Sequence, residues 1–176
     1  MKRKSLSVTK KTLNFYLTKL KDPQVRKLYS LFSNNLASMD LTNKKIMVGV
    51  SGGADSLAVL FFSQCYALKH HTKLYPVIID HKLRKESTIE AKNLKYKLKQ
   101  NFKINCKILS KKIVRINKNI QSYARDLRYD LFFEECNKQK IDYLILGHHK
   151  DDLIENFFIR FLRGSGLKGL VSFDKN

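Results

Sequence analysis

A six-residue junction between two apolar segments constrains the fold of this chain more than any other feature. The run Ile46–Val50 is short and rich in Ile and Val, as strands are, whereas the apolar stretch that begins at Leu57 is long enough to be a helix. A strand, a glycine turn and a helix in this order are typical of the β-α-β unit of a parallel sheet. The junction consists of Ser51, Gly52, Gly53, Ala54, Asp55 and Ser56. We therefore expect an α/β fold whose first strand ends in this loop.

The residue types in the loop favour phosphate binding. Gly52 and Gly53 let the backbone turn sharply and approach a ligand closely. The hydroxyls of Ser51 and Ser56, together with the N–H groups of the helix start, can hydrogen-bond phosphate oxygens. An isolated Gly-Gly pair would more often be a tight turn only. The loop fits neither the GxxxxGKS type nor the GxGxxG type, because no Lys follows the glycines and the spacing differs. A different kind of phosphate chemistry is implied.

The rest of the chain repeats the alternation of short apolar runs with longer amphipathic stretches. Strands are expected at 46–50, 74–79, 104–109 and 143–146, and helices at 57–70, 87–102 and 120–138. The second helix opens with Ser87 and Glu90 at the spacing of a capping box, and another helix should follow Asp151. This pattern predicts a doubly wound, mainly parallel sheet of four strands.

The N-terminal residues 1–44 differ in character from the remainder of the chain. They hold ten Lys and Arg against two acidic residues, and their apolar residues recur at helical spacing, for example at Leu13, Leu17 and Leu20. A length of 176 residues suits one α/β domain with an appendage. We expect a basic helical N-terminal extension, residues 1–44, and one nucleotide-binding domain, residues 45–176.

The charge of the chain indicates a polyanionic partner. The formal net charge is +20, from 35 Lys and Arg against 15 Asp and Glu. Because no stretch approaches the roughly 20 apolar residues of a membrane span, we expect nucleic acid rather than a lipid surface. An alternative is compositional bias, since Lys-rich surfaces are often only solvated faces. Three cysteines without CxxC spacing suggest neither disulfides nor a zinc or iron–sulfur site, and fit a cytoplasmic protein.

The loop at residues 51–56 resembles the pyrophosphate loop (PP-loop) of N-type ATP pyrophosphatases. These enzymes split ATP into AMP and pyrophosphate to activate a carbonyl oxygen. The resemblance implies an adenine nucleotide alpha hydrolase-like fold, ATP bound by the whole loop, and Asp55 as both a catalytic residue and a ligand of Mg²⁺.

Two further segments are similar to tRNA(Ile)-lysidine synthetases. One is Asp80-His81-Lys82-Leu83-Arg84, which follows an expected strand at the edge where open α/β sheets bind ligands. Without that context, Asp80 would only cap a turn and His81 would be solvated. The other is residues 122–129, with the sequence SYARDLRY, which contains Arg128. The resemblance implies that Asp80 and His81 contact the nucleotide and that Arg128 stabilises negative charge during the reaction.

A third segment carries the strongest resemblance to the same family. Residues 147–155 read GHHKDDLIE, and an arginine- and glycine-containing stretch, RFLRGSGLKGL, follows at 160–170. Asp152 and Glu155 lie at i and i+3 near an expected helix start, so both carboxylates can share a face and take a proton or bind Mg²⁺. Favourable placement at a helix dipole is an alternative for these acids, whereas a zinc site lacks a Cys or third His. The candidate substrate or RNA residues are Arg84, His148, His149, Arg160, Arg163 and Lys168.

By this resemblance the chain is an ATP-dependent ligase. It would adenylate the wobble cytidine of tRNA(Ile) with a CAU anticodon and then join free L-lysine to it, forming lysidine. Two residues depart from the family pattern: Asn156 stands where Thr is usual, and Lys82 stands where Gly is common. A homodimer is the default expectation for assembly.

Three other functions stay open. A PP-loop tRNA thiolase would use the same loop but would need reactive cysteines. A small-molecule synthetase would need no RNA. A non-catalytic module would bind nucleotide or RNA only, and this alternative gains weight because members of the family continue well past residue 176. The chain is then a fragment, a degenerate product, or a minimal form in which residues 1–44 grip the RNA.

Overall fold

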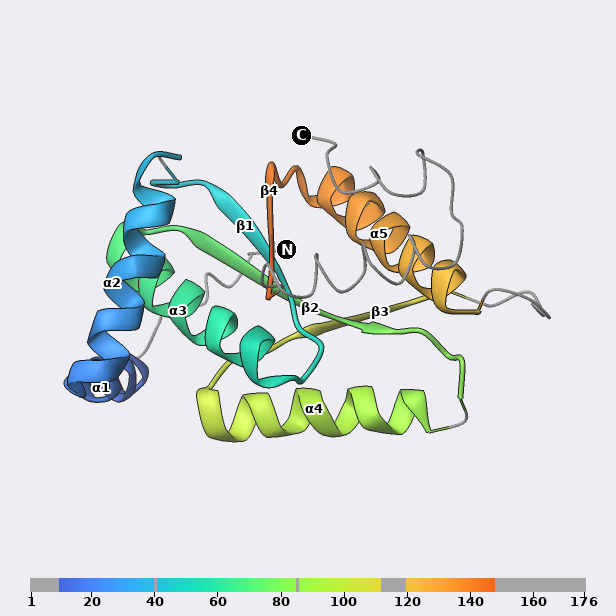
Figure 1. Ribbon diagram of the computed structural model, residues 1–176, viewed down its shortest axis with the longest axis horizontal. Helices are drawn as coiled ribbons and strands as arrows, with labels where there is room; N and C mark the ends of the chain where they lie inside the picture. Colours follow the sequence, from blue (N-terminus) through green and yellow to red (C-terminus); the bar gives the residue numbers. More distant parts are fainter. Residues whose placement is uncertain (1–9, 40, 85, 112–119, 148–176) are drawn as a thin grey trace, which may run out of the picture. The chain divides into compact units, whose positions relative to one another are not determined.

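The computed structural model describes residues 10–39, 41–84, 86–111 and 120–147. Five helices and four strands lie in this part of the chain (Figure 1). The helices are α1 Lys10–Lys19, α2 Pro23–Ala37, α3 Ala54–His70, α4 Ser87–Phe102 and α5 Ile120–Gln139. The strands are β1 Lys45–Gly49, β2 Lys73–Asp80, β3 Lys107–Ser110 and β4 Tyr143–Leu146. The helix expected after Asp151 lies outside the described residues.

The four strands form one sheet in the order β3-β2-β1-β4, and every pairing is parallel. In the central strand, Gly49 lies opposite Val77 of β2 on one side and Leu146 of β4 on the other. The chain moves from β1 outward to β2 and β3 and then returns to the other side of β1. The point between β1 and β4 is therefore a topological switch point, where open α/β sheets bind ligands.

The two faces of the sheet are covered by different helices, as the alternation of side chains requires. Ile46 and Val48 of β1 belong to the larger hydrophobic core, to which α3 and α4 contribute. Met47, between them, belongs to a second core with Val77 and with Phe132 of α5. Figure 1 shows α3 and α4 on one side of the sheet and α5 on the other. The prediction of a doubly wound parallel sheet is confirmed.

The N-terminal extension contains the two helices α1 and α2, and both pack on α3. Tyr16 of α1 is 1% exposed, lies beside the ring of Phe61, and donates a hydrogen bond to the carbonyl of Phe102. In α2, Tyr29 and Phe32 both contact the ring of Phe62. The helical character of this segment is as expected, and its inner face joins the core on the α3 side of the sheet. The boundary at residues 44 and 45 stays a prediction.

Two local expectations were wrong. The third strand begins at Lys107 rather than at 104, because Lys103 is left-handed (φ 56°) and the N–H of Ile104 donates to the carbonyl of Leu98, which closes the end of α4. The capping box at the start of α4 does not form. The hydroxyl of Ser87 accepts from the N–H of Arg84, and no side chain caps the helix.

Candidate functional site

The loop after β1 forms at the carboxyl end of the central strand. The N–H of Val50 still donates to the carbonyl of Val77 at 2.8 Å, which carries the β1–β2 pairing one residue past the strand. The backbone then turns at Gly52, whose φ of +92° lies in a region that side-chain-bearing residues rarely adopt. Helix α3 begins at Ala54, three residues earlier than expected, because Gly53 is its N-cap and accepts the N–H of Leu57 at 3.0 Å. The loop thus leads directly into a helix N-terminus.

The hydroxyl of Ser56 holds the loop in this conformation. Its Oγ accepts from the N–H groups of Ser51 (3.3 Å) and Gly52 (3.2 Å), and it donates to the carbonyl of Gly53 (2.9 Å). The hydroxyl of Ser51 lies 3.0 Å from it. Ser56 is 4% exposed, so its side chain faces into the loop. The side chain therefore shapes the cradle, and a direct contact of Ser56 with phosphate stays a prediction.

The rest of the loop faces outward. Ser51, Gly52, Gly53, Ala54 and Asp55 are all exposed. A Cβ added at Gly53 would meet only the hydroxyl of Ser51, at 3.7 Å, so the space beside this glycine is open. The first N–H groups of a helix and the helix dipole both attract anions. This open, amide-rich surface suits a phosphate group.

Asp55 lies in the first turn of α3 and is exposed beside the cradle. Among the described residues, no group of three or more His, Cys, Asp and Glu is placed to hold a metal ion. Mg²⁺ typically takes one or two carboxylates and completes its shell with water and substrate phosphates. One exposed carboxylate next to a phosphate cradle fits that requirement.

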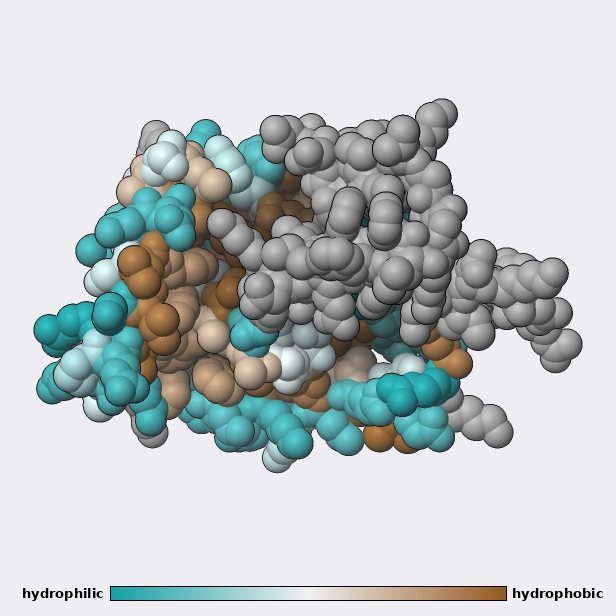
Figure 2. Space-filling model, in the orientation of Figure 1, coloured by the Kyte–Doolittle hydropathy of each residue, from teal (hydrophilic) through white to brown (hydrophobic). Residues whose placement is uncertain are grey.

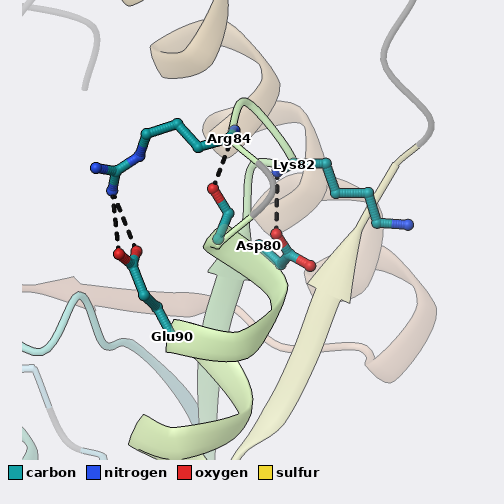
Figure 3. Close-up of polar contacts among 5 residues, drawn as sticks. Asp80, Lys82, Arg84 and Glu90 are labelled. Atoms are coloured by element: carbon teal, nitrogen blue, oxygen red, sulfur yellow. Dashed lines mark hydrogen bonds and ion pairs between the residues drawn. The ribbon is translucent and has the colours of Figure 1, made fainter.

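Asp80 ends β2 and is almost completely buried, with 3% exposure. Its Oδ1 accepts the N–H of Lys82 at 3.0 Å, and its Oδ2 accepts the hydroxyl of Thr88 at 2.7 Å (Figure 3 shows the Lys82 bond). The carboxylate thus fixes the turn after β2 and the first turn of α4. Thr88 was not among the expected site residues, and its role could only be seen in the folded structure. Contact of Asp80 with a nucleotide stays a prediction.

Arg84 and Lys82 lie in the same turn but differ from Asp80 in exposure. The guanidinium of Arg84 pairs with Glu90 at 3.1 Å (Figure 3), and the side chains of both residues are more than half exposed. Such a surface pair contributes little to stability, about 0–1 kcal/mol. Lys82 has a φ of +51°, in the left-handed region that favours glycine. This conformation gives a physical reason for Gly at the position in the resembling family.

His81 and Arg128 are 47 positions apart and meet in the structure, His81 following β2 and Arg128 lying on α5. The Nη2 of Arg128 lies 3.3 Å from the Nε2 of His81. Because a guanidinium can only donate, this contact requires a neutral imidazole with its proton on Nδ1. Burial and the nearby Arg128 cation lower the pKa of His81, and the negative charge of Asp80 opposes that shift. Burial likewise lowers the pKa of Arg128, with a smaller contribution from the cation of Arg125. The two expected nucleotide contacts are thus coupled to each other.

The remaining expected site residues lie outside the described residues. They are Asp152, Glu155, His148, His149, Arg160, Arg163 and Lys168. Within the described part of the chain, the cradle of residues 51–56 and Asp80 occupy the carboxyl ends of the adjacent parallel strands β1 and β2. No helix in this part is long and apolar enough to cross a membrane.

The fold and the loop together define the class of protein. Residues 20–176 match the PP-loop domain family, and the chain belongs to that family. The prediction made from the loop sequence is therefore confirmed. ATP binding is the established property of this class of domain.

Three proteins that are similar to this chain carry the same name. The chain is 44% identical over 130 residues to the tRNA(Ile)-lysidine synthase of Orientia tsutsugamushi, a match that covers 74% of this chain and 29% of that protein. It is 37% identical over 148 residues to the enzyme of the same name from the Wolbachia of Brugia malayi, covering 84% and 34% respectively. The corresponding protein of Rickettsia rickettsii (strain Sheila Smith) is 36% identical over 155 residues, covering 85% and 31%. The chain thus spans about a third of the length of these relatives.

A solved structure supports the fold. The U34-tRNA thiolase NcsA from Methanococcus maripaludis, determined with its [4Fe-4S] cluster, superposes with a TM-score of 0.64. The match covers 88% of this chain and 53% of that one at 22% identity. At this identity the likeness concerns the arrangement of helices and strands.

Proposed function

We propose that this chain is the ATP-activating domain of a tRNA(Ile)-lysidine synthetase. One observation carries the proposal: the Ser51–Ser56 loop forms an open cradle at the N-terminus of α3, beside the switch point of a parallel sheet. The three relatives named above are 36–44% identical to this chain over 130–155 residues. The substrates would be ATP, a tRNA(Ile) with a CAU anticodon and free L-lysine, with Mg²⁺ as the metal and the cytoplasm as the compartment.

The first step would be adenylation of the wobble cytidine. The O2 atom of the base attacks the α-phosphorus of ATP, the bond from that phosphorus to the bridging oxygen breaks, and pyrophosphate leaves into the cradle. The helix N-terminus and the loop N–H groups stabilise the charge on the departing pyrophosphate. Asp55 would hold Mg²⁺, which neutralises part of that charge.

The second step would join lysine to the activated base. The neutral amine of lysine attacks the C2 atom of the ring, a carbon–nitrogen bond forms, and the carbon–oxygen bond to AMP breaks. The attacking nitrogen loses a proton, for which Asp152 or Glu155 is the proposed acceptor by resemblance to the family. Arg128, held by His81 at 3.3 Å, would stabilise negative charge on the nucleotide.

Pyrophosphate release tests this proposal. The purified chain is incubated with ATP and Mg²⁺, with and without a CAU-anticodon tRNA(Ile) transcript, alongside an Asp55→Ala variant. We expect release that depends on the RNA and is lost in the variant, while the circular dichroism spectrum stays unchanged. Release without RNA would instead indicate a small-molecule synthetase, and undiminished release by the variant would refute the role of Asp55.

A module that binds nucleotide or RNA without catalysis is the second candidate. The open cradle at the N-terminus of α3 is compatible with it, because a helix N-terminus can bind phosphate without any reaction. Such a module would bind ATP and RNA and release no pyrophosphate.

The thiolase alternative is less well supported by the cysteines. Cys65, Cys106 and Cys136 are all buried. Burial raises the pKa of the thiols of Cys65 and Cys106 to about 12 and also raises that of Cys136. Thiols in such surroundings are poor nucleophiles, because the reactive form is the thiolate.

A further inference from the structure

We propose that the outer face of α2, together with Lys21 at the α1–α2 corner, is a binding surface for the phosphate backbone of the RNA substrate. This inference rests on the proposed function and assigns part of the RNA contact to the N-terminal helices. We call this surface the α2 groove. It is lined by Lys21, Pro23, Arg26, Lys27, Ser30, Leu31 and Asn34.

The spacing of residues along α2 separates an inner face from an outer one. Tyr29, Phe32 and Leu36 recur at intervals of three and four and pack inward, the first two against Phe62. Lys27 lies on the opposite side of the helix, Arg26 lies on its flank, and both are exposed. The lining of the groove is therefore not needed for the core, and its residues are available to a partner.

The groove is open and strongly basic. Its volume is about 380 Å³, and three of its seven lining residues are cations. The sequences of α1 and α2, KKTLNFYLTK and PQVRKLYSLFSNNLA, contain no Asp or Glu. In Figure 2, hydrophilic residues gather where Figure 1 places the α1–α2 corner, with hydrophobic residues beside them over α2.

The acidic residue between the two helices is engaged with the backbone. Asp22 is the N-cap of α2, and its Oδ1 accepts the N–H groups of Gln24 at 2.9 Å and Val25 at 3.0 Å. The Nε of Arg26 donates to the carbonyl of Leu20 at 3.3 Å, which holds the guanidinium at the corner. Among the described residues, no carboxylate forms a salt bridge with Lys21, Arg26 or Lys27.

Charge complementarity identifies the occupant as a nucleic-acid backbone. Three cations in one open groove match a chain of phosphates, and the hydroxyl of Ser30 and the amide of Asn34 can donate to phosphate or sugar oxygens. Leu31, which is 56% exposed, adds an apolar contact that a base or ribose can cover. An anionic lipid surface would also attract cations, and the test therefore includes it.

A pair of matched triple variants tests the inference. The groove variant is Lys21→Gln, Arg26→Gln and Lys27→Gln, and the control is Lys92→Gln, Lys97→Gln and Lys99→Gln on α4, whose side chains are also exposed. Both remove three positive charges. Affinity for a labelled CAU-anticodon tRNA(Ile) transcript is measured over a range of salt concentrations, and thermal melts confirm folding.

We expect the groove variant to lose about 100-fold in RNA affinity near 0.1 M salt, since each lost phosphate contact removes a factor of about five. The slope of log K against log salt should fall in magnitude by about 2–3, and the control should change little. Equal losses in both variants, or no loss in either, would overturn the proposal. So would loss of binding to anionic phosphatidylserine vesicles with RNA binding intact.

ATP binding separates this inference from the proposed function. The groove variant should bind ATP as the wild type does, because the cradle is unchanged. The Asp55→Ala variant should show the reverse: full RNA affinity and no pyrophosphate release. If the groove variant bound RNA as tightly as an enzymatically active wild type, the groove proposal would be refuted and the proposed function would stand.

Discussion

Replacing Gly53 with Ala separates the role of the loop in folding from its role in ligand binding. Gly53 has φ −70° and ψ 160°, a conformation that alanine adopts without strain. The added Cβ would meet only the hydroxyl of Ser51, at the ordinary contact distance of 3.7 Å. Alanine is a poorer N-cap than glycine but restricts the unfolded chain, so we expect the free energy of unfolding to change by less than about 1 kcal/mol.

The same methyl group should weaken ATP binding. It occupies the open space next to the helix N-terminus, where the phosphates are proposed to lie, and would displace them from one or two backbone N–H groups. A hydrogen bond to a charged group contributes about 1.5–3 kcal/mol, so the loss of one such bond should lower affinity about 10- to 150-fold, and the loss of two should lower it further. Isothermal titration calorimetry with Mg-ATP measures this change, and urea denaturation measures stability.

Gly49→Ala is the matched control. A Cβ there would lie 2.5 Å from Leu146 and 2.7 Å from Phe132, so the core must shift at a cost of about 1–3 kcal/mol. We expect this variant to be less stable but to bind ATP normally while it is folded. If Gly53→Ala bound ATP as tightly as the wild type, the cradle would not be where the phosphates lie.

Four further substitutions test individual contacts. Lys82→Gly should raise the free energy of unfolding by about 0.5–1 kcal/mol in urea denaturation, because glycine relieves the left-handed φ; a decrease would contradict that reading. His81 has a lowered pKa, so it contributes stability above its ordinary pKa of 6.5 that is lost as pH falls through the lowered value. His81→Gln should make the free energy of unfolding depend less on pH. An unchanged pH profile would show that His81 does not cause this dependence. Lys107→Met leaves the buried carboxylate of Glu135 unpaired and should cost about 1–3 kcal/mol, whereas Lys111→Met, at an exposed pair, should cost clearly less; equal losses would show that burial of Glu135 does not matter.

Most of the secondary structure of the described residues could be predicted from sequence periodicity. Helix α4 has the expected bounds, Ser87–Phe102, and β4 has the expected bounds, Tyr143–Leu146. Buried parallel strands and amphipathic helices leave strong local patterns, which is why these predictions held. The start of β3 was missed because the left-handed Lys103 extends the helix end into the apolar run.

The sequence indicated which residues belong to the candidate site better than it indicated which of them contact each other. Motif resemblance named both His81 and Arg128, but no sequence pattern shows that two residues 47 positions apart share a hydrogen bond. Similarly, no sequence pattern shows that the hydroxyl of Ser56 accepts the N–H of Gly52 and donates to the carbonyl of Gly53. The directions of side chains depend on how α5 and the loop pack, and that is a property of the whole fold.

Transfer of labelled lysine to RNA tests the central claim most directly. The purified chain is mixed with ATP, Mg²⁺, radiolabelled lysine and a CAU-anticodon tRNA(Ile) transcript, and label joined to RNA is counted together with pyrophosphate released. We expect the two to appear in equal amounts and both to disappear in Asp55→Ala. ATP binding without any lysine joined to the RNA would contradict the ligase and leave a nucleotide-binding module.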